Sequence, residues 1–405
     1  MDILIDGVPL PADIKTPDAR QTLAAHEAPW LGLWIGAWGN QIKHLMVVES
    51  VAADGTVAAV YAVGAFPETG ITPSWSRCSG KVDGKTLAIA GKVQAARYAH
   101  TPSGRLNDVY GDGMIHAIMD RQSLETITAP DVRVPWTRGM YQMVETDLRE
   151  DNKPVRLEVV LFSPEGDGPF PLAIINHGST GQGDDPALFG NTWVDSGIAE
   201  FLNERGWLVA FPQRRGRGKS DGLYDEGFAE NRSEGYTGET VPSLIGAERG
   251  LIDIEAVIAA LRKRPDVDAG PVLMAGQSRG GALTITYAGR HPAQVCGAIN
   301  FVGGWISDAC KNASAINNTL FSQGGKYDRP ALWLYGQGDY FYSMDHCREN
   351  FDAFRNAGGK GEFMEFTVNG QNNGHHVLAY PPLWQKPVAR YLDSLADFEA
   401  GDDTG

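Results

Sequence analysis

The chain has 405 residues, with 35 Lys and Arg against 50 Asp and Glu, and therefore a formal net charge of −15 at pH 7. This acidic balance disfavours nucleic acid and anionic membrane surfaces as partners, and no run of about 18 apolar residues is present to span a membrane. The length exceeds that of one ordinary hydrophobic core, which favours two domains.

The first ten residues mix Asp2, Asp6 and Gly7 with apolar residues, which is not the pattern of a secretory signal. The localisation stays open between a cytoplasmic protein and a periplasmic or secreted one from which a signal was removed. Four cysteines are present without C-x-x-C spacing, so the sequence predicts neither a zinc site nor a redox motif. Two of them, Cys310 and Cys347, follow neighbouring predicted strands and can form a disulfide if the protein is exported.

Between Trp34 and Arg121 the chain carries short alternating runs such as 44–51 and 56–63, and almost no helical periodicity. The pairs Asp54-Gly55, Asp83-Gly84 and Ser103-Gly104 are typical of hairpin turns, and they are spaced as in an antiparallel meander. We therefore expect a small antiparallel β-barrel or sandwich domain over 1–130. The string Trp34-x-Gly36-x-Trp38 resembles the G-x-W opening of lipocalin-like barrels, over one strand.

From residue 155 onward, strands alternate with helices, which predicts a mostly parallel sheet covered on both faces. We expect an α/β domain over 131–405, with its longest helix over 243–264. The segment 303–328 shows little periodicity, lies between two core strands and contains Trp305, Phe321 and Tyr327. Long loops in compact domains tend to be functional, so we expect a cap or lid near 303–328 that lines the substrate pocket.

A glycine-rich turn, G-Q-S-R-G-G over 276–281, separates the apolar run 271–275 from the helix-like segment 282–290. A strand that reverses abruptly into a helix strains its tip, and Gly276 and Gly280 remove the side chains that would collide there. The hydroxyl of Ser278 would then stand clear of the sheet, with the amide of Arg279 aimed at a developing oxyanion. Ser278 is therefore the predicted nucleophile.

A serine hydroxyl is a poor nucleophile at neutral pH, so it requires a base and an orienting acid in the chain order Ser, Asp, His. Asp339 follows the apolar run 331–335, and His375 follows the predicted strand 362–368. In open α/β sheets, the functional residues lie just past the carboxyl ends of the strands, as these two would. His376 is the rival base, whereas Asp345, the rival acid, better suits a helix N-cap.

A second oxyanion donor is expected from the loop after an early core strand. The run 171–176 is such a strand, and H-G-S-T-G follows it over 177–181. We expect the amide of Ser179 to be this donor, beside that of Arg279. His177 lies between a strand end and a tight turn, so we interpret it as shaping the loop.

Several further strings carry a family resemblance: R-R-G-R-G-K-S-D-G over 214–222, P-D-V-D over 265–268 and G-H-H-V-L over 374–378. With the turn at Ser278, they make residues from about 131 to 398 similar to the α/β-hydrolase fold, and within it to dienelactone-hydrolase-like and prolyl-oligopeptidase-like serine hydrolases. The G-H-x-x-L loop of those enzymes favours His375 over His376. Gln213 stands where many peptidase relatives have an acidic residue, which weakens a peptidase assignment. Because position 213 is not glycine, 213–220 is not a Walker A loop.

The sequence thus predicts a serine esterase that cleaves a small-molecule carboxylic ester through an acyl-enzyme on Ser278, without a cofactor or metal. A peptidase or amidase of the prolyl-oligopeptidase-like type is the nearest alternative. A binding protein, in which the β domain carries the function and the hydrolase fold is idle, is the second. Trp305 and Tyr340 are the expected substrate-binding residues, and the oligomeric state is left open.

Overall fold

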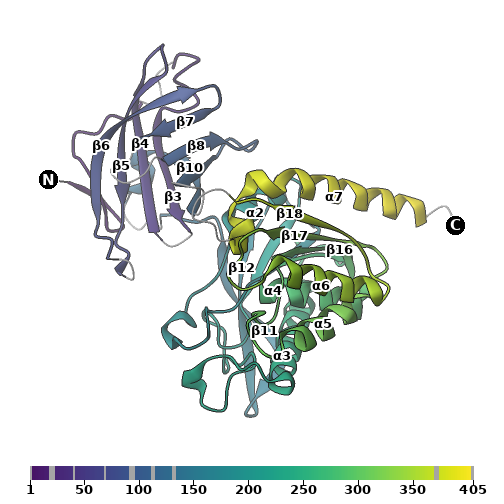
Figure 1. Ribbon diagram of the computed structural model, residues 1–405. Coiled ribbons are helices and arrows are strands. Elements are labelled where there is room, and N and C mark those ends of the chain that lie inside the picture. The colour runs from purple at the N-terminus through teal and green to yellow at the C-terminus, as the bar shows by residue number, and fades with distance from the viewer. Residues whose placement is uncertain are drawn as a thin grey trace. The chain divides into compact units, whose positions relative to one another are not determined.

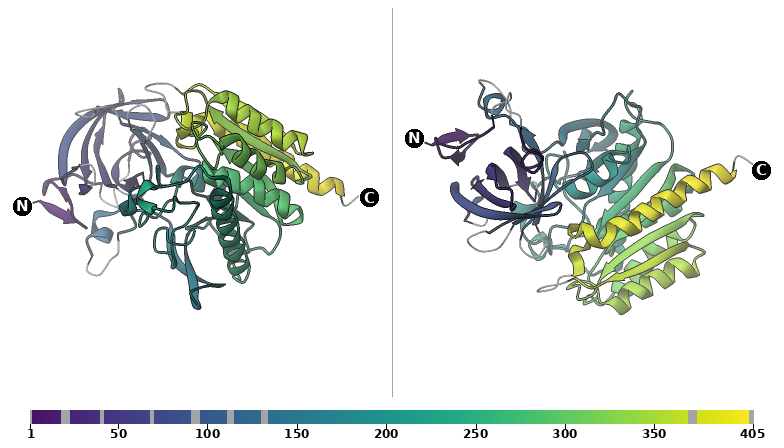
Figure 2. Two further views of the ribbon diagram at one scale, coloured as in Figure 1. Left: turned by 60° about the horizontal axis from the view of Figure 1, so that its bottom comes forward. Right: turned by 90° about the horizontal axis from the view of Figure 1, so that it is seen from above.

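The structure is a computed structural model that describes residues 2–17, 23–39, 42–67, 70–90, 96–110, 115–129, 134–368 and 374–402. The chain divides into two compact units, Met1–Arg138 with Asp195–Glu200, and Gly139–Val194 with Phe201–Gly405. Figure 1 labels the elements of both units, and Figure 2 shows them from two further directions. The boundary at residue 130 that we expected from the sequence stays a prediction.

The first unit is a closed antiparallel barrel, so the predicted barrel or sandwich fold is confirmed as a barrel. Its strands run in the order β10-β3-β4-β5-β6-β7-β8-β9, each paired with its neighbour in the chain, and β10 closes the barrel on β3. The strands are β3 (Gly32–Trp38), β4 (Ile42–Val51), β5 (Thr56–Val63), β6 (Ser74–Asp83), β7 (Thr86–Ile89), β8 (Ala96–His100), β9 (Leu106–Tyr110) and β10 (Ile115–Gln122). A hairpin of β1 (Ile3–Ile5) and β2 (Val8–Leu10) precedes them, and the short helix α1 (Leu124–Ile127) follows.

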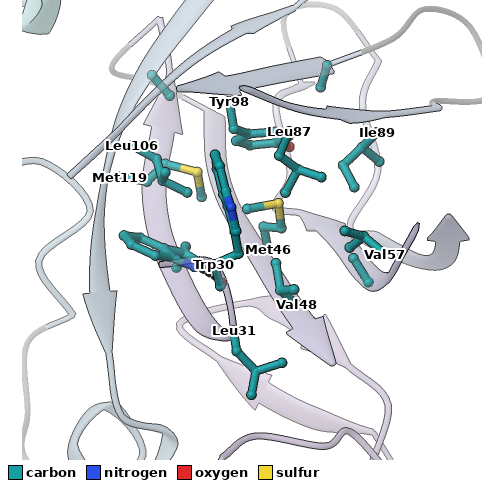
Figure 3. Packing of buried hydrophobic residues seen from close by; sticks show 14 of the residues in the cluster. Trp30, Leu31, Met46, Val48, Val57, Leu87, Ile89, Tyr98, Leu106 and Met119 are labelled. Atoms are coloured by element: carbon teal, nitrogen blue, oxygen red, sulfur yellow. Dashed lines mark hydrogen bonds between the residues drawn. The ribbon is translucent and has the colours of Figure 1, made fainter. Parts of the chain in front are cut away.

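Large apolar side chains fill the inside of the barrel. Met46, Tyr98, Leu106 and Met119 are fully buried there and lie together in Figure 3. At Gly36, a Cβ atom would lie 2.6 Å from the Ile118 carbonyl oxygen, so a side chain there would push β3 from β10. Trp30, Trp34, Trp38 and Tyr98 are buried members of this core. The resemblance to lipocalin-like barrels stays a prediction.

The second unit contains an eight-stranded sheet in the order β11-β12-β14-β13-β15-β16-β17-β18. The pairs β11–β12 and β12–β14 are antiparallel, and all later pairs are parallel, as predicted. The strands are β11 (Met140–Glu150), β12 (Lys153–Phe162), β13 (Leu172–Asn176), β14 (Leu208–Pro212), β15 (Val272–Gln277), β16 (Val295–Phe301), β17 (Pro330–Gly336) and β18 (Lys360–Phe366). Strands β13 to β17 are almost wholly buried, as parallel strands covered on both faces must be.

Helices cover both faces of this sheet (Figure 1). On one face lie α3 (Thr240–Leu261), α4 (Arg279–Arg290), α5 (Ala313–Gly324) and α6 (Met344–Asn356), and on the other α7 (Pro381–Asp402) and the end of α2 (Ser196–Asn203). On that second face, Trp384 of α7 packs against both β16 and α2. Its ring centroid lies 5.7 Å from that of Phe301 and 5.2 Å from that of Phe201. None of the helices in the described ranges is long and apolar enough to cross a bilayer.

Helix boundaries differ from the sequence expectation by a few residues. The helix expected over 243–264 begins at Thr240 and ends at Leu261. Helix α6 has Ser343 as its N-cap, whose hydroxyl accepts from the His346 amide, and not Asp345. Asp345 lies instead in the first turn, fully exposed and paired with Arg348, where its charge complements the helix dipole.

Candidate active site

The turn at Ser278 has the strained backbone that its glycines suggested. Strand β15 ends at Gln277, α4 begins at Arg279, and Ser278 between them has φ 56° and ψ −123°, which is unfavourable for a residue with a side chain. A Cβ atom on Gly276 would lie 2.2 Å from the Gly280 carbonyl oxygen, and one on Gly280 would lie 2.1 Å from the Asn176 carbonyl oxygen. The close contact of the three backbone segments therefore depends on these two glycines.

An aspartate and a histidine form a buried pair beside this turn. Asp339 follows β17, and its Oδ2 accepts a hydrogen bond of 2.8 Å from His375 Nδ1. Its other oxygen, Oδ1, accepts from the amides of Phe341 (2.7 Å) and Tyr342 (3.2 Å). The side chain of Asp339 is 1% exposed. Because the carboxylate fixes the proton on Nδ1, the His375 Nε2 atom is left as the basic nitrogen.

Ser278 and His375 line one cavity of ≈ 240 Å³ in the second unit. Ser179, Arg279 and Trp305 also line it, so the structure brings five of the predicted site residues to one space, with Asp339 behind His375. The lining residues are Gly178, Ser179, Gly181, Gln182, Trp193, Arg217, Tyr236, Gln277, Ser278, Arg279, Trp305, Ile306, Ser307, Cys310, Phe341, Tyr342, His375 and His376.

Two predicted residues differ in their placement. Tyr340 is 71% exposed and is not among the lining residues, although it adjoins Asp339 in the chain. His376 lines the cavity, but it is His375 that contacts the carboxylate of Asp339. Burial, and then the neighbouring His375, lower the pKa of His376.

The loop after β13 approaches the nucleophile closely, since a Cβ atom on Gly178 would lie 3.0 Å from that of Ser278. Ser179 follows on the wall of the cavity. The Arg279 amide lies in the first turn of α4, where amides have no acceptor within the helix. Both backbone groups expected to bind an oxyanion thus belong to segments next to Ser278.

His177 is buried behind this loop. Its Nδ1–H donates to the Gly178 carbonyl at 2.7 Å, and its Nε2 accepts from the Arg214 amide at 3.2 Å. Burial, and then Arg214 and Arg217, hold the pKa of His177 well below its ordinary value. Both ring nitrogens are engaged by backbone groups, so His177 shapes the loop.

Other residues of the cavity were not predicted from the sequence. Tyr342 donates its hydroxyl to the Gly304 carbonyl at 2.7 Å, and burial raises its pKa well above the ordinary value. The guanidinium of Arg279 lies 3.6 Å from the ring centroid of Tyr236 and 4.5 Å from that of Trp305. The only sequence signal for Tyr342 was its place three residues after Asp339. Tyr236 lies in a long loop with no motif, so nothing in the sequence indicated it.

The segment 303–328 contains helix α5, which packs on α4 and α6. Only its first part lines the cavity, through Trp305, Ile306, Ser307 and Cys310. Phe321 instead packs on Trp333 with a centroid distance of 4.9 Å. A role of this segment as a cap or lid stays a prediction.

The four cysteines are all free, so Cys310 and Cys347 form no disulfide in this structure. Within the described ranges, no group of three or more His, Cys, Asp or Glu is arranged to hold a metal ion.

A family model matches part of this unit. Residues 192–320, about a third of the chain, match the model of the family described as serine aminopeptidase, S33. No curated protein sequence matches the chain. The strand order, the turn at Ser278 and the family match identify the second unit as an α/β-hydrolase, which confirms the predicted superfamily.

Solved structures that are similar to the chain include esterases. The chain is similar to esterase Pf2001 of Pyrococcus furiosus at 15% identity and a TM-score of 0.44, covering 65% of this chain and 95% of that one. It is also similar to Est1E of Butyrivibrio proteoclasticus, solved with ferulic acid, at 17% identity and a TM-score of 0.44, covering 62% and 99%. Similarities of this size do not identify a substrate, and the narrower resemblance to dienelactone-hydrolase-like or prolyl-oligopeptidase-like enzymes stays a prediction.

Proposed function

We propose that this protein hydrolyses carboxylic esters of small molecules through an acyl-enzyme on Ser278, with His375 as the base and Asp339 as the acid that orients it. The observation that carries the proposal is the 2.8 Å hydrogen bond between His375 Nδ1 and a buried carboxylate, at a cavity that also exposes a serine in a strained turn. Nucleophile, base and orienting group are the three parts that such a reaction needs.

In the proposed reaction, Ser278 Oγ attacks the ester carbonyl carbon while His375 Nε2 takes the hydroxyl proton. The carbonyl oxygen becomes an oxyanion, which the amides of Ser179 and Arg279 stabilise. As the tetrahedral intermediate collapses, the C–O bond to the alcohol breaks and His375 returns the proton to the leaving oxygen. Water, deprotonated by His375, then attacks the acyl group and releases the acid and free Ser278.

The lining of the cavity favours an ester over a peptide with a free amino terminus. Among the described lining residues there is no Asp or Glu, whereas Arg217 and Arg279 are both present. A peptide ammonium group would therefore meet two guanidinium groups and no carboxylate on the wall of the cavity, which is unfavourable. The small volume of ≈ 240 Å³ further favours a small acyl group.

The test is hydrolysis of an activated short-chain aryl ester by the wild type, Ser278→Ala and Ser307→Ala. Ser307 also lines the cavity, so it serves as the matched hydroxyl control. We expect a loss in kcat of about 10³-fold or more for Ser278→Ala and at most about tenfold for Ser307→Ala. An unchanged rate in Ser278→Ala would overturn the proposal, and faster turnover of aminoacyl or prolyl amides than of matched esters would favour the peptidase alternative.

A further inference from the structure

The carbonyl oxygen of Gly178 receives three hydrogen bonds from buried side chains. His177 Nδ1 donates at 2.7 Å, Arg214 Nη2 at 3.2 Å and Arg217 Nη1 at 3.5 Å. The next amide, that of Ser179, belongs to the same planar trans peptide, so its N–H points away from this carbonyl and its donors. The side chains that hold the Gly178 carbonyl therefore also fix the direction of the Ser179 N–H.

Arg214 is the main support of this loop. Besides the Gly178 carbonyl, its Nη1 donates to the His177 carbonyl at 2.9 Å, so one guanidinium holds two consecutive peptide groups. Its Nε is paired with Glu226 Oε1, and both side chains are almost fully buried. The position of the loop is thus linked to the Glu226 carboxylate.

The other proposed oxyanion donor is linked to the same carboxylate. Arg279 supplies its amide at the start of α4, and its Nη1 donates to the Glu226 carbonyl at 2.8 Å and lies 3.6 Å from Glu226 Oε2. The aromatic rings of Tyr236 and Trp305 flank the same guanidinium. Glu226 Oε2 also accepts from the Tyr224 hydroxyl at 3.1 Å. Each carboxylate oxygen of Glu226 therefore contacts one arginine: Oε1 contacts Arg214, and Oε2 contacts Arg279.

We propose that Glu226 is a positioning residue that sets the separation of the two oxyanion donors, by tying Arg214 and Arg279 to one buried carboxylate. This inference rests on the proposed function of Ser278. It assigns a purpose to the side chain of Arg279, whose amide alone was expected to act. Neither Arg214 nor Arg279 can move without stretching a contact to Glu226. Such a movement is unfavourable, because a buried charge left without its partner is costly.

The adjacent arginine provides a matched control. Arg215 forms another buried pair with Asp253 of α3, with 2.6 Å between Nε and Oδ1 and 2.9 Å between its amide and Oδ2. The partners of Arg215 lie on α3, at Asp253 and Arg249, and not in the loop of Gly178. Loss of this pair should destabilise the same unit without moving an oxyanion donor.

The experiment compares Glu226→Gln with Asp253→Asn in the full chain. Both should lower the thermal stability, but only Glu226→Gln should lower kcat, by about ten- to a hundredfold, with KM nearly unchanged. A trifluoromethyl ketone, which forms a tetrahedral adduct on serine, should bind Glu226→Gln weaker by a similar factor, while an unreactive amide analogue binds equally well. Equal kinetic losses in the two variants, or a kcat unchanged in Glu226→Gln, would overturn the inference.

Arg214→Lys and Arg215→Lys form a second pair if Glu226→Gln does not fold. Lysine keeps the charge but cannot hold two carbonyls in the fixed geometry of a guanidinium. We expect the same selective fall in kcat and in ketone affinity for Arg214→Lys, and its absence would overturn the inference. If Ser278→Ala keeps full activity, the proposed function itself fails. If Ser278→Ala is inactive but the paired variants behave alike, only the role of Glu226 is wrong.

Discussion

His375 and His376 are neighbours in the chain, yet only the first has its Nδ1 atom directed at a carboxylate, 2.8 Å from Asp339 Oδ2. The second lines the same cavity with its pKa lowered, mainly by burial. An imidazole becomes an effective base when a fixed acceptor holds its tautomer and stabilises the imidazolium ion. A position on the wall of the cavity does not by itself supply such an acceptor.

His375→Ala should therefore lower kcat for a short-chain ester by about 10³-fold or more, whereas His376→Ala should change it by at most about tenfold. Steady-state kinetics on the two variants, with circular dichroism to confirm folding, make the comparison. The reverse order of effects would assign the base to His376 and contradict the proposed triad.

His177 allows a prediction on pH. Its pKa is lowered from the ordinary value of 6.5, chiefly by burial, so the folded protein resists protonation more than the unfolded chain does. The corresponding stability is present above pH 6.5 and is lost as the pH falls below it, by up to about 1.4 kcal/mol per pH unit.

In His177→Gln, which cannot be protonated, this loss should be absent. Amide hydrogen exchange in β13, directly before residue 177, measures the local free energy of opening at pH 7.5 and 5.5. We expect the wild type to lose more protection than the variant on acidification. Parallel losses in the two proteins would show that His177 does not titrate in this window.

At the scale of elements, the connection of β15 to α4 depends on close contact between backbone segments, which leaves no room for a side chain. A Cβ atom at Gly280 would lie 2.1 Å from the Asn176 carbonyl, which is backbone and cannot rotate away. By contrast, nothing lies within 4 Å of a Cβ atom built on Gly190. Gly190 is therefore the matched control.

Gly280→Ala should destabilise the second unit by about 3 kcal/mol and move Ser278 out of place, so that activity falls as well. Gly190→Ala should leave both nearly unchanged. Chemical denaturation and ester hydrolysis measure the two effects. If Gly280→Ala were as stable and as active as Gly190→Ala, the close packing of this turn would be wrong.

The same elements indicate how far the sequence could predict the structure. Alternating hydrophobicity and glycine turns predicted the barrel, and strands that alternate with helices predicted the mostly parallel sheet, because these patterns are local. The site depended on local signals too: a glycine-rich turn after one strand and single polar residues after two others led to Ser278, Asp339 and His375. Ser278 and His375 line one cavity, and Asp339 lies behind His375. Their catalytic roles stay predictions.

Contacts between distant segments could not be predicted in this way. Glu226 contacts Arg214 and Arg279 only in the folded chain. Asn176 contacts Gly280, although the two residues are 104 positions apart in the sequence. Tyr340 was expected to bind substrate, but it is 71% exposed and Tyr342 lines the cavity instead. Side-chain direction in a loop depends on backbone angles that hydrophobic patterns do not report.

For the whole molecule, every residue that lines the described cavity belongs to the second unit, Gly139–Val194 with Phe201–Gly405. The barrel has its own core, and so has the α/β-hydrolase unit. Units of this kind can fold separately. The chemistry should therefore not require residues of the barrel.

A chain that lacks residues 1–138 should hydrolyse a short-chain ester with a kcat/KM within about tenfold of the full-length value. Residues Asp195–Glu200, which group with the first unit, are the place where stability could suffer, so the melting temperature is measured beside activity. A folded but inactive fragment would show that the barrel contributes to the site.

The central claim is that Ser278 is the nucleophile, and covalent labelling tests it most directly. The full-length protein is treated with an aryl phosphonofluoridate, which reacts with activated serine hydroxyls, and the modified residue is located by mass spectrometry of its peptides. We predict one adduct, on Ser278, that protects against further labelling and is missing in Ser278→Ala. A stoichiometric adduct on another residue, or undiminished labelling of Ser278→Ala, would contradict the account.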